Sequence, residues 1–297
     1  MFPVKEEDGL ILLFDYRVKR GETSISFRQK QKTKKMACIL HIETSTNVCS
    51  VALSKDGYLL YEKEDHGDGM SSKAAEKLGG FISEALERLS SPAAQTPEAD
   101  KELTTHLDAV SVSSGPGSYT GLRIGVSMAK GICYGKDAKL ISVPTLELLC
   151  VPVLLGDRIR CTSWVDGKEE QLTAELYDNA LLCPMIDARR MEVFAAIYDR
   201  ALNNIRQPQA DIVEGETYKD LLDNHVVYFF GNGALKCREV INHPNARFIA
   251  GIEPLAKNML PLAEKRFNKD TTEDVAYFVP QYLKEYQAKK QKNLLVK

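Results

Sequence analysis

The stretch Ala109-Val-Ser-Val-Ser-Ser-Gly-Pro-Gly-Ser-Tyr-Thr-Gly-Leu-Arg-Ile-Gly-Val-Ser-Met-Ala-Lys-Gly-Ile-Cys133 decides the fold of this chain. It opens with a β-branched, apolar run that predicts a buried strand. Gly115-Pro116-Gly117 then predicts a sharp turn, because glycine tolerates positive φ and proline fixes φ. Ser118 or Thr120 is suited to cap a helix that follows. The stretch is therefore a strand, a tight turn and a helix.

The predicted helix carries four small residues, each four positions after the last: Gly121, Gly125, Ala129 and Cys133. Residues four apart share one helix face, so this face has little side-chain bulk. One interpretation is close packing against another backbone, and the other is anion binding at a helix N-terminus. The dinucleotide fingerprint is not met, because Gly121 comes one residue late, and the lysine of a P-loop is missing. We favour packing, because each interior glycine costs a helix about 1 kcal/mol relative to alanine.

Composition limits the class of protein. A chain of 297 residues with 44% hydrophobic content is large enough for two lobes. A net charge of −2 gives no support for nucleic-acid binding by bulk electrostatics, although a local basic patch stays open. The seven cysteines form no C-x-x-C pair, which indicates buried thiols in a reducing compartment and predicts a cytoplasmic protein. No apolar run approaches the length of about 18 residues that a membrane span needs.

The first half of the chain has a clear order of elements. Polar turns, including an Asp-Gly turn at 56–57, separate segments with strand or helix periodicity. We predict strands at 38–42, 48–53, 58–63, 109–113 and 139–143, and helices at 71–89 and 120–133. The order β-β-β-α-β-α-β predicts an α/β fold, with the lobe found in actin-like and ribonuclease-H-like proteins.

The second half repeats this order in a weaker form. Strands at 181–186 and 192–198 flank a polar turn, as in the opening of the first lobe. Residues 156–180 are polar and predict no element. We further predict helices at 145–155 and 254–265, and strands at 226–230 and 246–249. The second lobe is thus expected to be a degenerate copy of the first.

Domain boundaries follow from these patterns. The strand pattern starts only at Cys38, after a basic run at 28–35 and Met36. We interpret residues 1–35 as a disordered extension or as the result of a start assigned too early; a basic targeting arm is the alternative. The predicted first lobe is 36–143, rejoined by 276–297, and the predicted second lobe is 144–275.

Four stretches together resemble the bacterial TsaB (YeaZ) family, in that family's order. They are Ile39-Leu-His-Ile-Glu-Thr-Ser-Thr-Asn-Val-Cys-Ser-Val-Ala-Leu53, Ser114-Gly-Pro-Gly-Ser-Tyr-Thr-Gly-Leu-Arg-Ile-Gly125, Ile186-Asp-Ala-Arg-Arg-Met-Glu-Val-Phe194 and Pro280-Gln-Tyr-Leu-Lys284. The resemblance covers nearly all of 36–297. It implies a two-lobe actin-like fold of the ASKHA type with a degenerate second lobe. It also implies a non-catalytic part in forming N6-threonylcarbamoyladenosine beside the anticodon of tRNA.

The resemblance carries expectations about partners. TsaB proteins pair with the paralogous transferase TsaD, are joined by the ATPase TsaE, reach tRNA through that complex and form homodimers when alone. No cofactor of its own is implied, since ATP and the metal ion are handled by the partner subunits. The family packs the first two helices of the first lobe against those of a second molecule. The implied interface residues are Met70, Ser71, Ala74, Ala75, Leu78, Tyr119, Gly121, Leu122, Gly125, Met128 and Ala129.

The resemblance also provides a test for catalysis. In TsaD the strand after the glycine-rich helix leads into a helix with His-x-x-x-His, whose two histidines bind a metal. Thr145 and Leu149 stand at those positions here. Leucine cannot bind a metal and a lone threonine is a poor ligand. The five histidines of the chain form no i, i+4 pair, so TsaD-type catalysis is not expected.

Two acidic residues are candidates for a relic nucleotide site. Glu43 and Asp187 each end the first strand of a lobe, where actin-like phosphotransferases keep acids for Mg²⁺-nucleotide. With Thr44, Ser45 and Thr46, the first of them could form a relic phosphate loop. The favoured alternative is that these are turn residues bonded to the local backbone.

Two further functions stay as alternatives from the sequence. One is an ATP-dependent small-molecule kinase of the same superfold, and the other, a metalloprotease, lacks an H-E-x-x-H motif. The tail lysines could contact tRNA phosphate or could be a solvated tail: Lys284, Lys289, Lys290 and Lys292.

Overall fold

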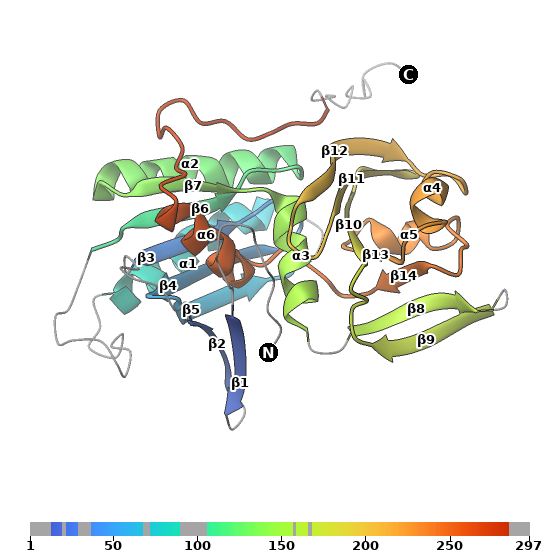
Figure 1. Ribbon diagram of the computed structural model, residues 1–297. Coiled ribbons are helices and arrows are strands. Elements are labelled where there is room, and N and C mark those ends of the chain that lie inside the picture. The colour runs from blue at the N-terminus through green and yellow to red at the C-terminus, as the bar shows by residue number, and fades with distance from the viewer. Residues whose placement is uncertain are drawn as a thin grey trace, which may run out of the picture.

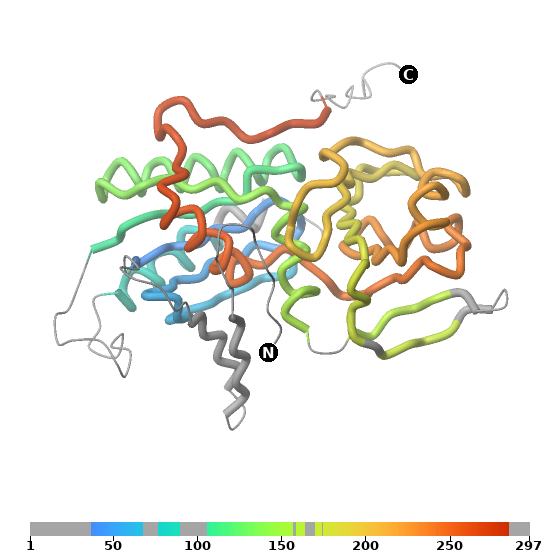
Figure 2. The backbone as a smooth tube through the Cα atoms, viewed as in Figure 1, coloured from blue at the N-terminus to red at the C-terminus, as the bar shows by residue number. Residues whose placement is uncertain are grey.

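The computed structural model describes residues 13–19, 22–28, 37–67, 72–89, 106–156, 159–165 and 168–284 (Figures 1 and 2). The side chains of residues 13–19, 22–28, 72–76, 164, 165, 168, 169 and 174 are not described. The described chain forms two lobes side by side, each built on a seven-stranded mixed sheet. None of its helices is both long enough and apolar enough to cross a membrane.

The first lobe has the predicted order of elements. Its sheet runs β1-β2-β5-β4-β3-β6-β7, in which β3, β4 and β5 form an antiparallel meander and β6 and β7 continue parallel to β3. The strands are β1 (Leu13–Lys19), β2 (Glu22–Arg28), β3 (Cys38–Glu43), β4 (Cys49–Lys55), β5 (Tyr58–Asp65), β6 (Ala109–Ser113) and β7 (Lys139–Val143). Helices α1 (Ser72–Leu89) and α2 (Tyr119–Lys136) pack on one face of this sheet over a common apolar core (Figure 1).

The second lobe repeats the strand order of the first. Its sheet runs β12-β11-β10-β13-β14-β8-β9, so its first five strands correspond to β5-β4-β3-β6-β7 in order and direction. The strands are β8 (Ile159–Val165), β9 (Lys168–Ala174), β10 (Leu181–Asp187), β11 (Glu192–Tyr198), β12 (Asn204–Ile212), β13 (Val227–Phe230) and β14 (Ala246–Ile249). The predicted repetition of the first lobe is therefore present in the topology itself.

The degeneracy of the second lobe lies mainly in its helices. Where the first lobe has two helices of 18 residues, the second has α4 (Lys219–Leu222) and α5 (Ala234–Cys237), each of four residues. The hairpin of β8 and β9 is an addition at the sheet edge, in a stretch where the sequence predicted no element. A four-residue helix buries little apolar surface, so the second lobe covers its outer sheet face with shorter pieces.

Three helices join the lobes. Helix α3 (Thr145–Leu155) is buried on opposite sides: Leu149 and Val153 face the second sheet, and Leu148 and Val151 face the first. The 3-10 helix η2 (Ala256–Met259) and α6 (Leu260–Asn268) return from the second lobe to pack on β3 and β7. Apolar side chains of α3 pack against both sheets, and those of η2 and α6 pack against the first, so the two lobes are held together by apolar packing.

The end of the described chain crosses back over the first lobe, and we call residues 274–284 the strap (Figure 1). Lys130 of α2 donates hydrogen bonds to the carbonyls of Ala276 (2.9 Å) and Phe278 (3.0 Å). The amide of Gln281 donates to the carbonyl of Ser114 at 2.7 Å. The strap is thereby fastened to the turn before α2.

The arm at residues 1–35 contains strands β1 and β2, for which the sequence had predicted no structure. They pair with each other over seven residues, but β2 joins β5 by the single pair Ser26 and Tyr58. Whether the arm contributes to stability stays a prediction, as do the domain boundaries.

Candidate functional site

The glycine stripe of α2 faces the chain's own first lobe. A Cβ placed on Gly125 would lie 2.3 Å from the Oγ1 of Thr44, and one on Gly121 would lie 2.0 Å from the Thr44 carbonyl oxygen. A Cβ on Gly117 would meet the Ser45 carbonyl oxygen at 2.3 Å. The Thr44 hydroxyl uses this space to donate a hydrogen bond of 2.8 Å to the Gly121 carbonyl. The missing side chains let the turn after β3 lie directly on α2, which is the packing interpretation.

The assignment of this stripe to the partner interface is wrong. Gly125 is buried, and Leu122 and Ala129 are wholly inaccessible to solvent inside the first lobe, as is Leu78 of α1. Gly121 is half-buried but lies against Thr44. The four small residues do share one helix face, as predicted. The four-residue period does not indicate on which side of the helix the rest of the lobe lies.

The remaining interface predictions fall into two groups. Tyr119 and Met128 are half-buried, and Met128 packs against the core of the first lobe. Met70 and Ser71 lie outside the described residues, and for Ala74 and Ala75 only the backbone is described.

The turn before α2 is filled by the protein's own atoms. The Ser118 side chain caps the helix by accepting from the Gly121 amide at 3.2 Å, while the Ser118 amide donates to the Ser45 carbonyl at 2.6 Å. Gly115 has a φ of +102°, and a Cβ there would lie 2.5 Å from the Gln281 carbonyl oxygen. The strap and the β3 turn thus lie directly against the glycines that an anion cradle would have to leave open.

Glu43 is wholly buried at the end of β3, and one of its oxygens accepts from the Ser45 amide at 2.5 Å. Its Oε2 is buried and has no hydrogen-bond partner among the described residues, as is the case for the hydroxyls of Ser45 and Ser113. Burial raises the pKa of Glu43 to about 7, because a carboxylate is poorly solvated there. Thr44 and Ser45 are also buried, and Thr46 is partly exposed. This arrangement fits a turn residue better than an exposed ligand of Mg²⁺-nucleotide.

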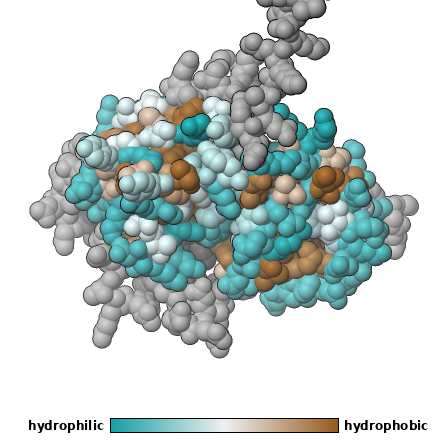
Figure 3. Space-filling view, turned by 90° about the horizontal axis from the view of Figure 1, so that it is seen from above, coloured by the Kyte–Doolittle hydropathy of each residue, from teal (hydrophilic) through white to brown (hydrophobic). Residues whose placement is uncertain are grey.

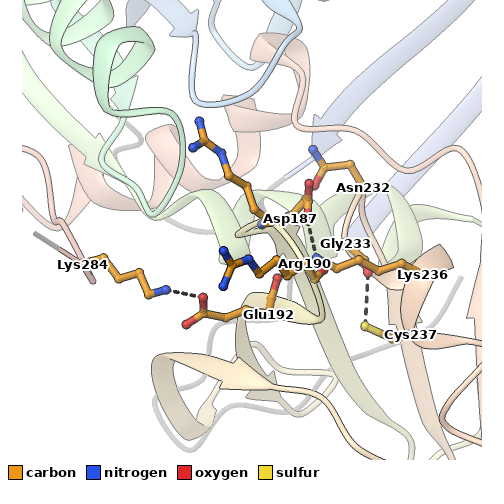
Figure 4. Close-up of polar contacts among 9 residues, drawn as sticks. Asp187, Arg190, Glu192, Asn232, Gly233, Lys236, Cys237 and Lys284 are labelled. Atoms are coloured by element: carbon orange, nitrogen blue, oxygen red, sulfur yellow. Dashed lines mark hydrogen bonds and ion pairs between the residues drawn. The ribbon is translucent and has the colours of Figure 1, made fainter. Parts of the chain in front are cut away.

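Asp187, the acid of the second lobe, is paired with a lysine of its own chain (Figure 4). The Lys236 amine donates to this carboxylate and to the carbonyls of Arg190 and Glu192, both at 2.7 Å. The Asp187 amide donates to Asn232 Oδ1 at 2.9 Å. An ammonium group thus compensates the charge of this carboxylate, whereas Glu43 is enclosed by burial.

Sequence reasoning missed the conformation of the loop after Asp187. Arg189 and Arg190 are both exposed and both left-handed, with φ values of +74° and +51°. Left-handed backbone costs a non-glycine residue about 1 kcal/mol or more, so two in succession need outside support. Lys236 gives that support by binding the loop carbonyls. The motif Asp-Ala-Arg-Arg contains no glycine that would have signalled this turn.

The positions of the paralogue's two histidines are packed interior. Thr145 is wholly buried at the start of α3, and Leu149 belongs to the apolar core against the second sheet. His41 is a buried core histidine in β3, within 2.7 Å of the Ser111 hydroxyl and 2.8 Å of the Ser54 hydroxyl. Burial lowers its pKa to about 3, so it stays neutral. Within the described residues, no group of three or more His, Cys, Asp or Glu is placed to hold a metal ion.

Comparisons with known proteins agree with this geometry. Residues 87–292 match the family TsaD, tRNA N6-adenosine threonylcarbamoyltransferase. The chain is 25% identical over 259 residues to the tRNA threonylcarbamoyladenosine biosynthesis protein TsaB of Escherichia coli, covering 83% of this chain and 94% of that protein. It is 27% identical over 165 residues to the Bacillus subtilis protein of the same name, covering 54% of each.

A solved structure from Pseudomonas aeruginosa, described as similar to the peptidase YEAZ, has the same fold, with a TM-score of 0.63 and 20% identity. It covers 84% of this chain and is itself covered completely. The four motifs, the doubled sheet and these matches lead to one conclusion: the chain belongs to the TsaD family of tRNA threonylcarbamoyl transferases and, within it, to the TsaB (YeaZ) group, whose work is the biosynthesis of threonylcarbamoyladenosine in tRNA.

Proposed function

We propose that this chain is a non-catalytic subunit that binds and activates a TsaD-like transferase in the cytoplasm. In this proposal a TsaE-like ATPase joins the pair, tRNA is bound by the assembled complex, and the chain forms a homodimer when alone. The observation that carries the proposal is the withdrawal of both acids, Glu43 by burial and Asp187 by Lys236.

The argument rests on what catalysis in this fold requires. A phosphotransferase needs carboxylates that reach a Mg²⁺-nucleotide between the lobes. Glu43 is enclosed by Thr44 and Ser45 and has a raised pKa, and Asp187 has its charge compensated. The same observation counts against an ATP-dependent small-molecule kinase, which would need at least one of these acids to be available.

The partner surface is placed on the outward side of α1 and α2. This side carries residues that are exposed: Gly80 and Ser83 on α1, and Ser127, Gly131 and Tyr134 on α2. A Cβ on Gly131 would meet nothing within 4 Å, and Tyr134 is 88% exposed. The small side chains permit close approach of another helix pair, and the tyrosine offers a large apolar contact.

Gly131→Leu tests this surface, with Gly131→Ala as its matched control. Both variants remove the cost of a helical glycine, but only leucine adds bulk to the contact. We expect the leucine variant to melt no lower than the wild type while it weakens association with the TsaD-like subunit by about tenfold. Association can be measured by light scattering and by co-purification from the native host. Unchanged association of the leucine variant would place the interface elsewhere.

The absence of catalysis is tested by reconstitution with tRNA. We expect no transfer of threonylcarbamoyl and no appreciable ATP turnover by the chain alone, and transfer when the TsaD-like and TsaE-like subunits are added. Turnover by the chain alone that is lost in Glu43→Gln or Asp187→Asn would refute the non-catalytic role.

A further inference from the structure

The loop that Lys236 supports lies beside the end of the strap (Figure 4). Lys284, the last described residue of the strap, forms an ion pair with Glu192. Arg190 is two residues before Glu192, and its side chain extends toward the side from which Lys284 approaches. Two distant parts of the chain thus bring Arg190 and Lys284 to one place on the surface, and Arg189 directly precedes Arg190 in the loop.

The two arginines have no compensating charge among the described residues. Both side chains are exposed, and neither takes part in an ion pair or hydrogen bond through its guanidinium group. The nearby carboxylates are already used, Asp187 by Lys236 and Glu192 by Lys284. Uncompensated guanidinium groups on a chain with a net charge of −2 form a local positive site that the overall charge conceals.

The strap continues this site with aromatic side chains. Tyr282 is 40% exposed, and its ring lies 4.9 Å from that of Tyr119, centroid to centroid. Arg123 is exposed, donates to the Tyr119 hydroxyl at 2.9 Å and lies 5.2 Å from its ring centroid. Viewed from the strap, the surface is mainly hydrophilic with separate apolar patches over both lobes (Figure 3). We define the basic strip as Arg189, Arg190, Lys284, Tyr282, Tyr119 and Arg123.

The sequence that follows Lys284 is basic. Residues 285–297, which lie outside the described part of the chain, contain four lysines, at 289, 290, 292 and 297, and one acid, Glu285. Arginine and lysine side chains beside an exposed aromatic ring such as that of Tyr282 are the pattern of proteins that bind single-stranded or looped RNA, in which phosphates meet the charges and bases stack on the rings.

We propose that the basic strip binds the phosphodiester backbone of the RNA substrate. Arg189 and Arg190 are the central contacts, because a planar guanidinium group can give two parallel hydrogen bonds to one phosphate. The left-handed loop, bound by Lys236, fixes the backbone from which both side chains extend, so the loop does not have to become ordered when RNA binds. The proposal rests on the proposed function, which supplies tRNA as the ligand, and it adds a direct contact by this subunit.

The test measures binding of tRNA to the reconstituted complex by fluorescence anisotropy between 50 and 200 mM salt. The variant is Arg189→Gln with Arg190→Gln, since glutamine keeps a polar chain at both left-handed positions. Log K falls linearly with log salt, and each lost phosphate contact makes this slope less steep by about 0.7 for single strands. Loss of two contacts should therefore reduce the magnitude of the slope by about 1.4. As salt rises fourfold, the ratio of the tRNA-binding constant of the wild type to that of the variant should fall by about sevenfold.

Arg160→Gln is the matched control, because it removes one exposed arginine from β8, four strands from β11 in the sheet. At about 4.8 Å per strand, this residue lies roughly 19 Å from the strip and should not change the salt slope. A thermal melt of each variant, and its association with the TsaD-like subunit without RNA, complete the set.

Each outcome decides the question. A lower salt slope in the double variant alone, with unchanged melting and subunit association, supports the strip. An unchanged slope in a complex that still modifies tRNA overturns it and leaves the proposed function standing. Weaker subunit association without RNA would also overturn it, because the arginines would then meet an acidic protein surface. A wild-type chain that binds no TsaD-like subunit would instead refute the proposed function.

Discussion

Gly125→Ala and Gly131→Ala, two substitutions of one kind on one helix, are expected to change stability in opposite directions. At position 125 the new methyl group would lie 2.3 Å from Thr44 Oγ1 and 3.5 Å from Val112 Cγ2. At position 131 it would meet nothing within 4 Å. The pair therefore separates the effect of packing against the β3 turn from the effect of helix propensity.

The magnitudes follow from the contacts. In Gly131→Ala only the propensity gain of about 0.5–1 kcal/mol remains, so the free energy of unfolding should rise by that amount. In Gly125→Ala the same gain is opposed by overpacking of about 1–3 kcal/mol. It is also opposed by loss of the 2.8 Å hydrogen bond from Thr44 to Gly121, worth about 1 kcal/mol. The net expectation is a loss of about 1–3 kcal/mol.

Urea unfolding monitored by circular dichroism measures both changes. Thr44→Ala completes a double-mutant cycle with Gly125→Ala, because it removes the hydroxyl that the new methyl group would overlap. Gly125→Ala should therefore lower the free energy of unfolding less in the Thr44→Ala background than in the wild type. Equal stabilisation by both glycine variants would refute the argument, because the stripe would then not contact Thr44. Additive effects of Gly125→Ala and Thr44→Ala would refute it as well.

Three further outcomes can be measured. The pKa of Glu43 is raised from 4.5 to about 7 in the folded state, so the wild type should lose stability on the order of 2–3 kcal/mol as pH rises through that window. Glu43→Gln removes this loss, and its free energy of unfolding relative to the wild type should therefore rise with pH. The same difference between variant and wild type at pH 5 and at pH 8 would contradict this. Lys236→Met should lower the free energy of unfolding by about 1–3 kcal/mol, because two loop carbonyls lose their donor, and an unchanged melt would show that water replaces the amine. A chain starting at Met36 should keep its melting temperature within about 2–4 °C, since the arm meets β5 at one residue pair, and a larger drop would make the arm structural.

The sequence predicted the first lobe well because its signals are local and strong. Strand β7 and helix α3 have the predicted bounds, and β3 to β5 differ by one or two residues. In the second lobe β12 was missed: its exposed and half-buried residues alternate, but Pro208 weakens the strand pattern, and an edge strand tolerates a proline that an inner strand does not. The hairpin of β8 and β9 was missed because its polar residues give no clear periodicity.

The site could be predicted only in part, because its decisive contacts join distant segments. That Glu43 and Asp187 end equivalent strands was visible in the motifs. That Lys236 would reach Asp187 depends on the second lobe's own fold, 49 residues along the chain. The prediction that the glycine stripe faces a partner was wrong for the same reason. The four-residue period defines one face of the helix, but only the fold shows that this face lies against Thr44.

The two lobes differ in how they accommodate the acid that ends their first meander strand. In the first lobe the turn after β3 lies on α2, so Glu43 is enclosed and burial raises its pKa to about 7. In the second lobe α5 is a single turn of helix, and the corresponding turn after β10 stays at the surface, where a lysine compensates its acid. The enclosed turn after β3 offers no exposed charged group to a ligand, whereas the surface turn after β10 leaves Arg189 and Arg190 exposed to solvent. In the proposed RNA contact, the loop after β10 is the part of the second lobe that meets the phosphate backbone.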